Sequence, residues 1–179
     1  MKKLLLTAVA LLSLFAADYK SAASRQDYTV YVDDHGIMRR SDTDAEVSYY
    51  GTNYTVPFAH AYRALQLVGS DRKAVIDLDV AHMKRLGFNG FRLHLWDAEL
   101  ADSEGNLLRN DHLNLLDYLI FRLEESGIDI VLTAQTNFGN GYPERNIDTG
   151  AFTYDFDKCD IHANPKAQAI QERYLTQLA

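Results

Sequence analysis

A guanidinium, an imidazole and an indole alternate with apolar side chains in residues 91–97, which read FRLHLWD. Side chains two positions apart share one face of a strand, so Arg92, His94 and Trp96 are predicted to lie on the face opposite the apolar set. Burying an arginine is costly unless carboxylates or carbonyls surround it. We therefore expect Arg92 to orient a catalytic carboxylate or, alternatively, to pair with a structural acid.

His94 and Trp96 are candidate ligands of a sugar. An indole is flat and apolar and can pack against the C–H bonds of a sugar ring, whereas an imidazole can donate a hydrogen bond to a sugar hydroxyl or hold a neighbouring carboxylate. Each side chain has a simpler alternative, which is packing in the core. The six histidines of the sequence show no spacing typical of metal ligands, so we expect no metal site.

A polar and aromatic segment, residues 135–163, is longer than a connection between a strand and a helix requires, which is typical of binding loops. In it, Asn137 and Tyr142 offer hydrogen bonds and an aromatic plate. We predict that both residues, together with Glu144, bind substrate. Glu99 and Glu144 are the best candidates for general acid catalysis, although we expect both to be solvated loop carboxylates.

Three strand–helix units are predicted to position these residues. The strands are predicted at residues 47–54, 91–96 and 128–134, and the last of these is a nearly unbroken apolar run typical of strands buried on both faces. Residues 28–39 have the pattern of a β-hairpin with a turn at residues 33–36.

Capping residues and apolar periodicity predict the helices. Ser70 and Asn110 are expected to cap the first two, Gly87 and Gly127 to end them, and Asn164-Pro165 to open the third. The expected apolar stripes are Val75, Leu78, His82 and Leu86 in the first helix, Leu113, Leu116, Ile120 and Leu123 in the second, and Ile170, Tyr174 and Leu178 in the third.

Alternating strands and helices with short returns imply parallel strands and right-handed crossovers. A doubly wound nucleotide-binding sheet needs a glycine-rich turn after its first strand, and residues 51–54 (GTNY) are not one. We therefore predict an α/β fold: a partial (β/α)8 TIM barrel of about three βα units, preceded by the hairpin. Residues 24–46 form the lead-in, and residues 47–179 form the N-terminal part of a barrel that we expect to be truncated, because three parallel strands leave an open edge.

Residues 1–23 have the form of a secretory signal: a basic start, an apolar run too short to span a bilayer, and small residues near the predicted cleavage site. No cysteine follows the apolar run, which argues against a lipid anchor. We predict a secreted or periplasmic protein with no membrane association after cleavage. Cys159, the only cysteine, is expected to be a small buried residue.

The formal net charge is −7. An acidic surface without a basic stripe repels nucleic acid, so we expect no nucleic-acid partner, and it is compatible with a neutral carbohydrate. The sequence Gly139-Asn140-Gly141 lacks the following helix and Lys-Ser/Thr of a phosphate-binding loop, and we expect no cofactor.

Three stretches resemble clan A glycoside hydrolases, either the cellulase and mannanase-like family 5 or the related family 2 barrels. They are residues 51–54 (GTNY), 87–94 (GFNGFRLH) and 127–133 (GIDIVLT), and the similarity extends from residue 47 to the C-terminus.

The resemblance implies a retaining hydrolase of β-linked glycosides in poly- or oligosaccharides. Arg92 matches the family arginine that holds the nucleophile, whereas His94, Trp96 and residues 137–142 would line the sugar subsites. The family's catalytic glutamates lie on its fourth and seventh strands, so we expect the catalytic pair to be missing from this chain and the chain alone to be inactive.

Two alternatives remain open at the level of the sequence. One is a secreted, non-catalytic carbohydrate-binding protein that uses Trp96, Phe138 and Tyr142 as stacking platforms. The other is a complete small α/β protein in which Glu144 has an unrelated hydrolytic role.

Overall fold

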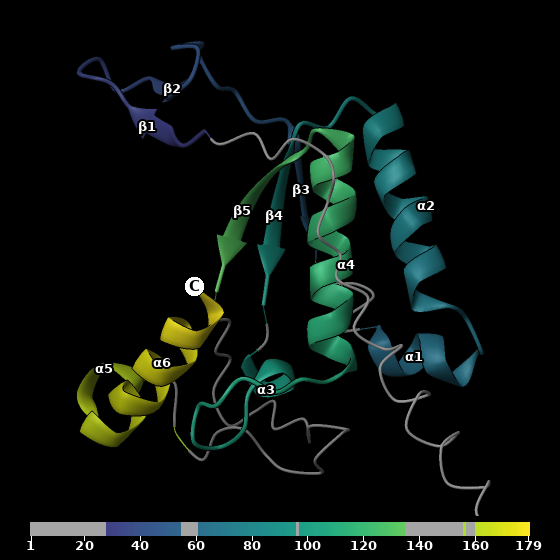
Figure 1. The fold of residues 1–179 in the computed structure, drawn as a ribbon, viewed down its shortest axis with the longest axis vertical. Helices are drawn as coiled ribbons and strands as arrows, with labels where there is room; N and C mark the ends of the chain where they lie inside the picture. The colour runs from purple at the N-terminus through teal and green to yellow at the C-terminus, as the bar shows by residue number, and fades with distance from the viewer. Residues whose placement is uncertain (1–27, 55–60, 96, 135–155, 157–159) are drawn as a thin grey trace, which may run out of the picture.

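The structure, a computed structural model, describes residues 28–54, 61–95, 97–134, 156 and 160–179 (Figure 1). In chain order its elements are β1 (Val30–Val32), β2 (Met38–Arg40), β3 (Gly51–Tyr54), α1 (Tyr62–Leu67), α2 (Arg72–Arg85), β4 (Gly90–His94), α3 (Asp97–Leu100), α4 (Asp111–Ser126), β5 (Asp129–Thr133), α5 (Asp160–Ala163) and α6 (Pro165–Leu178). The predicted signal segment lies outside the described residues. Among the described helices, none is long and apolar enough to cross a membrane.

Strands β3, β4 and β5 form a parallel sheet in that order. Thr52 lies opposite Phe91, which lies opposite Ile130. Between successive strands the chain crosses over through α2 and then α4, and Figure 1 shows these two helices side by side next to the sheet. Parallel strands joined by helical crossovers confirm the predicted α/β fold, and the arrangement is that of three consecutive units of a (β/α)8 barrel.

The predicted hairpin is also present. Strands β1 and β2 pair antiparallel, with Val32 opposite Met38, and the carboxylate of Asp33 accepts hydrogen bonds from the backbone amides of His35 and Ile37 across the turn. Figure 1 shows the hairpin apart from the helices, near the end at which the sheet strands begin. The hydroxyl of Tyr28 donates a hydrogen bond to Asp129, the first residue of β5, so the hairpin is tethered to the sheet.

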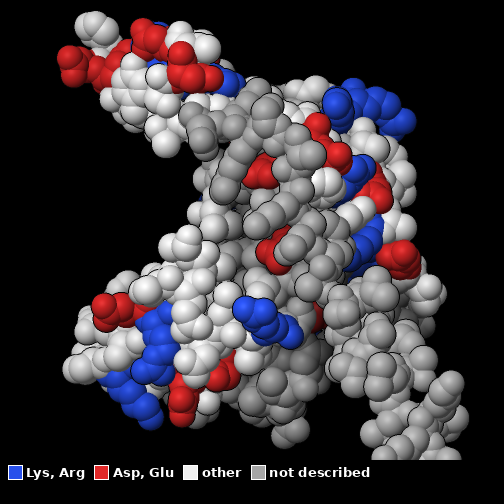
Figure 2. Space-filling view, in the orientation of Figure 1, with Lys and Arg blue, Asp and Glu red and all other residues white. Residues whose placement is uncertain are grey.

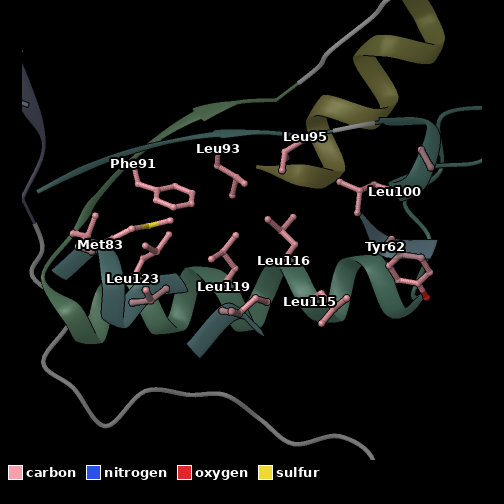
Figure 3. Packing of buried hydrophobic residues seen from close by; sticks show 14 of the residues in the cluster. Tyr62, Met83, Phe91, Leu93, Leu95, Leu100, Leu115, Leu116, Leu119 and Leu123 are labelled. Carbon is pink, nitrogen blue, oxygen red and sulfur yellow. The ribbon is translucent and has the colours of Figure 1, made fainter. Parts of the chain in front are cut away.

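The hydrophobic core lies between the sheet and α4. Phe91, Leu93 and Leu95 are at most 1% exposed and point from β4 towards α4 (Figure 3). Opposite them lie buried leucines of α4 and the buried face of α2. The buried side chains of these two helices that complete the cluster are Leu115, Leu116, Leu119, Leu123, Ile76, Val80 and Met83. This packing confirms that the apolar set of residues 91–95 faces the helices.

Local capping signals fixed the ends of α4 and α6. The side chain of Asn110 accepts a hydrogen bond from the amide of Leu113, and Gly127 ends α4 in the left-handed conformation at φ 68°. Asn164 caps α6 in the same way, and Pro165 occupies the first helical position. In both helices the predicted apolar stripes contribute to the buried face.

The predictions for α2 were wrong in two respects. Its N-cap is Asp71, not Ser70, because the Asp71 carboxylate accepts hydrogen bonds from the amides of Lys73 and Ala74. Its buried face is the Ile76, Val80 and Met83 stripe named above, whereas Leu78 and Leu86 of the predicted stripe are 56% and 62% exposed.

Helix α2 has apolar residues on two faces, and its sequence does not indicate which one meets α4. Figure 2 shows Lys/Arg and Asp/Glu side chains mixed along the outer surface of α2. The neighbouring helix therefore decides which of the two apolar stripes is buried.

Strand β5 differs from the prediction that both of its faces are buried. Val131 and Leu132 are 43% and 46% exposed. The reason is that β5 lies at the edge of the described sheet, with β4 on one side, and the described residues cover one face of that sheet. Three short helices, α1, α3 and α5, were not predicted from the sequence, since four to six residues are too few to show a periodicity.

Candidate functional site

Two polar side chains of β4 lie on the face of the sheet opposite the core. Arg92 is exposed, and its Nε donates a hydrogen bond to Oγ1 of Thr133 on β5 at 3.0 Å. The prediction that Arg92 is buried was wrong, because the described residues do not cover this face. Its predicted direction, away from the core, is confirmed, and the guanidinium remains accessible to an acidic partner.

His94 is the last residue of β4 and lies opposite Thr133 in the register. Partial burial lowers the pKa of this imidazole, and the positive charge of Arg92 lowers it further. A histidine with a depressed pKa is largely neutral near pH 7. It can therefore donate one hydrogen bond and accept another, which suits contacts with the hydroxyl groups of a sugar.

The same face carries a groove of about 360 Å³ over the first halves of β3 and β4. Its lining is Tyr49, Gly51, Thr52, Asn53, Gly90, Phe91, Arg92 and Val131. Asn53 and Arg92 are register partners, so an amide and a guanidinium sit side by side on the groove. This is a polar surface at the position that corresponds to the interior of a closed barrel.

Close packing at the start of β3 and β4 explains why glycine stands at position 51 and asparagine at position 89, in two of the stretches that resemble glycoside hydrolases. A Cβ atom at Gly51 would lie 1.6 Å from the carbonyl oxygen of Gly90, so only glycine fits there. Asn89 accepts a hydrogen bond from the amide of Tyr50 at 2.7 Å and donates one to the carbonyl of Ser48 at 2.8 Å. These contacts set the register that brings Asn53 beside Arg92.

Two acids are buried immediately after β4. Asp97 and Glu99 are 2% and 1% exposed, although Glu99 was predicted to be a solvated loop carboxylate. Its Oε2 lies 3.0 Å from Nε2 of His112, and its Oε1 lies 3.6 Å from Nη2 of Arg63. Burial of a carboxylate is compatible with such partners, which the prediction did not foresee.

Helix α6 also reaches this end of the sheet. The buried hydroxyl of Tyr174 donates a hydrogen bond to the carbonyl of Ala134, just after β5, at 3.0 Å. Burial raises the pKa of Tyr174, and the negative charge of Asp97 raises it further. The carboxyl ends of β4 and β5 and helix α6 therefore meet around Asp97 and Tyr174.

The remaining predicted site residues, Trp96, Asn137, Tyr142 and Glu144, lie outside the described residues, as do Phe138 and Cys159. Their roles stay predictions. In the part of the chain that the structure describes, no group of three or more His, Cys, Asp or Glu side chains is arranged to hold a metal ion.

Sequence reasoning overlooked the pair formed by Glu99 and His112. One signal was available: His112 continues the stripe of Leu116, Leu119 and Leu123 at helical spacing, which places it on the buried face of α4. A titratable residue on such a face requires a polar partner. The sequence does not show which residue that is.

A crystal structure of the endo-1,4-beta-mannanase from Rhizomucor miehei is similar to this chain, with a TM-score of 0.51 and 19% sequence identity. The similar region covers 78% of this chain and 39% of the mannanase, so the chain spans about two fifths of that enzyme. No family model and no curated protein match the sequence. At this identity the likeness shows a shared fold alone, and it agrees with the partial barrel arrangement of the parallel sheet.

Proposed function

We propose that this chain supplies the first three βα units of a secreted, retaining glycoside hydrolase that acts on β-linked poly- or oligosaccharides. The catalytic glutamates are then supplied by later strands of the barrel. The observation that carries the proposal is that Arg92 and His94 lie together on the face of β4 that the described residues leave open, in a chain whose fold is similar to that of a mannanase. Active sites of such barrels lie at the carboxyl ends of the strands, where His94 lies.

Arg92 is assigned the role of holding a catalytic carboxylate. Its guanidinium is accessible and permanently charged, and its Nε donates a hydrogen bond to Thr133. Its Nη1 and Nη2 nitrogens are further donors, and a carboxylate can accept hydrogen bonds from two nitrogens of a guanidinium at once. A glutamate from a later strand of a closed barrel would meet this guanidinium on the inner face.

His94 is assigned to the sugar-binding wall, together with Trp96, Asn137, Tyr142 and Glu144. The lowered pKa of His94 supports a neutral imidazole that contacts hydroxyl groups. The polar groove that contains Asn53 is a second surface on the same face. We assign no cofactor, because retaining glycosidases work with two carboxyl groups about 5–5.5 Å apart.

The test compares two proteins: the product of the complete reading frame that contains this chain, and the 179-residue chain. Each is incubated with mannan, xylan and β-glucan, and the released reducing ends are measured. We expect the complete product to hydrolyse at least one polysaccharide with retention of the β-anomer and the 179-residue chain to release none. Arg92→Lys in the complete product should lower kcat strongly, because lysine cannot hold a carboxylate through two nitrogens.

Two results would contradict the proposal. If the 179-residue chain is hydrolytic and Glu144→Gln abolishes this activity, the catalytic residue lies within the chain. If neither protein is hydrolytic but both bind the polysaccharide, the chain belongs to a non-catalytic carbohydrate-binding protein. That alternative is favoured by the aromatic residues Trp96, Phe138 and Tyr142 of the sequence.

A further inference from the structure

The buried pair of Glu99 and His112 joins two consecutive segments of the chain. Glu99 belongs to the short helix α3, which follows β4, and His112 lies in the first turn of α4. A hydrogen bond also joins the two segments, because Nδ2 of Asn110 donates to the backbone carbonyl of Glu99 at 2.8 Å. Because Asn110 also caps α4, the same side chain fixes the start of that helix and holds α3 against it.

Two further helices pack around this pair. The ring of Tyr62, from α1, stacks on the imidazole of His112 with 3.8 Å between the ring centroids, and the guanidinium of Arg72, from α2, lies 3.6 Å from the centroid of the Tyr62 ring. Arg63 of α1 reaches Glu99 itself. Elements α1, α2, α3 and α4 therefore meet at one buried, polar cluster.

A requirement for stability alone does not account for this pair. Taking a carboxylate and an imidazole out of water costs free energy, and replacing buried ion pairs with apolar residues of similar volume is often neutral or stabilising. What apolar contacts do not supply is a link between two particular atoms. The contact of 3.0 Å between Oε2 of Glu99 and Nε2 of His112 and the hydrogen bond from Asn110 to the Glu99 carbonyl are such links. Helix α3 has four residues and little stability of its own, so its position depends on such contacts.

The position of α3 matters because it begins at Asp97, only three residues after the end of β4. Leu95 is still held in the sheet, since its amide donates a hydrogen bond to the carbonyl of Thr133 at 3.0 Å, and the chain turns into α3 two residues later. Because α3 begins so close to this last anchored residue, a displaced α3 would strain the chain at the end of β4, where His94 lies. The pair itself lies on the helix-covered side and does not touch the open face.

We propose that Glu99 and His112 are positioning residues that hold α3 in place and, through it, the end of β4 at His94, the described residue of the proposed sugar-binding wall. The link to sugar rests on the proposed function. The pair acts on the substrate only through the segment that it holds. Its removal is expected to weaken substrate binding without changing the chemical step.

The first test uses the 179-residue chain, in which Trp96 is the only tryptophan and stands three positions before Glu99. The key variant combines Glu99→Met with His112→Phe, which replaces both partners by apolar side chains of similar volume. We expect a thermal midpoint close to that of the unsubstituted chain, but a shifted Trp96 emission maximum and altered quenching by acrylamide. Glu125→Gln is the matched control, because it removes an exposed ion pair with Arg122 on the same helix and should leave both readouts unchanged.

Unchanged emission and quenching in a folded double variant would overturn the proposal, because the pair would then be a replaceable part of the core. If the double variant does not fold, Glu99→Met alone gives the same decision. That substitution keeps the approximate volume of the side chain and removes the carboxylate that contacts His112.

The second test measures kinetics in the product of the complete reading frame, with mannohexaose as the probe, or the hexasaccharide of whichever polysaccharide is cleaved. We expect KM to rise about tenfold with kcat unchanged, because the pair affects only binding that the substrate and the transition state share; tenfold corresponds to about 1.4 kcal/mol. A shifted Trp96 signal with an unchanged KM would overturn the link to sugar binding. An unsubstituted product without any glycosidase activity would contradict the proposed function instead, and the fluorescence test would still decide whether the pair positions the chain.

Discussion

The two faces of β4 differ in the burial and the polarity of their side chains. On one face, Phe91, Leu93 and Leu95 are fully buried against α4, while on the other Arg92 is exposed and His94 is half-buried. Neighbouring side chains along the strand therefore lie alternately in the apolar core and on an accessible polar surface. The difference shows that one face contributes the apolar packing of the described fold, whereas the other keeps polar side chains accessible.

The largest expected change in stability comes from shortening a side chain that packs against the covered face of the sheet. Leu119→Ala should lower the free energy of unfolding by about 2–5 kcal/mol, because it deletes fully buried methyl groups and leaves a cavity. The matched variant on the uncovered part of the sheet, Val131→Ala, should cost well under half of that, since Val131 is 43% exposed. Urea denaturation measures both, and equal losses would refute the contrast between the two faces.

A smaller effect is expected at the boundary of the covered layer. Asn110→Ala should cost about 1 kcal/mol or somewhat more, because the amide of Leu113 loses its cap and the carbonyl of Glu99 loses its donor. Asn164→Ala removes a similar cap from α6 and serves as the comparison. If both variants lose the same amount of unfolding free energy, the hydrogen bond from Asn110 to the Glu99 carbonyl contributes nothing measurable, and the prediction is wrong.

The hydrogen bond between Tyr54 of β3 and Asp79 of α2 should make the stability of the fold depend on pH in the alkaline range. Burial raises the pKa of Tyr54, and its hydrogen bond of 2.6 Å to Asp79 and the charge of that carboxylate raise it further. The folded state therefore favours the neutral phenol, so this stabilisation is present below the unfolded pKa of about 10 and is lost as the pH rises above it. Tyr54→Phe should reduce the fall in unfolding free energy above pH 10, and an unchanged slope would contradict the assignment.

The smallest expected effect is a pH dependence of stability that arises from His94, on the other face of the sheet, at acidic pH. Because burial and Arg92 lower the pKa of His94, the unfolded chain takes up this proton more readily than the folded protein does. The stability contribution of neutral His94 is complete above the unfolded pKa of about 6.5 and declines as the pH falls through that value. His94→Gln should flatten the dependence between about pH 5 and 7 in chemical denaturation, by a few tenths of a kcal/mol at this partly exposed position.

The sequence predicted those parts of the fold that depend on neighbouring residues. Asn110, Gly127 and Asn164-Pro165 specify helix ends through contacts within one turn, and all were placed correctly. The alternation in residues 91–95 likewise predicted which side of β4 is buried. In each case the physical cause lies within a few residues of its effect.

Features that depend on distant partners were missed. The buried face of α2 is decided by the position of α4, and the burial of Glu99 is decided by His112 and Arg63 from two other helices. The exposure of Arg92 depends on which strands cover the inner face of the sheet. None of these partners is indicated by the local sequence.

The tether between Tyr28 and Asp129 has a consequence for the order in which the chain becomes ordered. The two residues are 101 positions apart, so a ribosome releases the hairpin long before it synthesises the aspartate that holds it. The hairpin turn can close early from its own residues, but its docking must await β5 and with it the third strand of the sheet. Docking of the hairpin therefore depends on β5, the last strand of the described sheet, being in place.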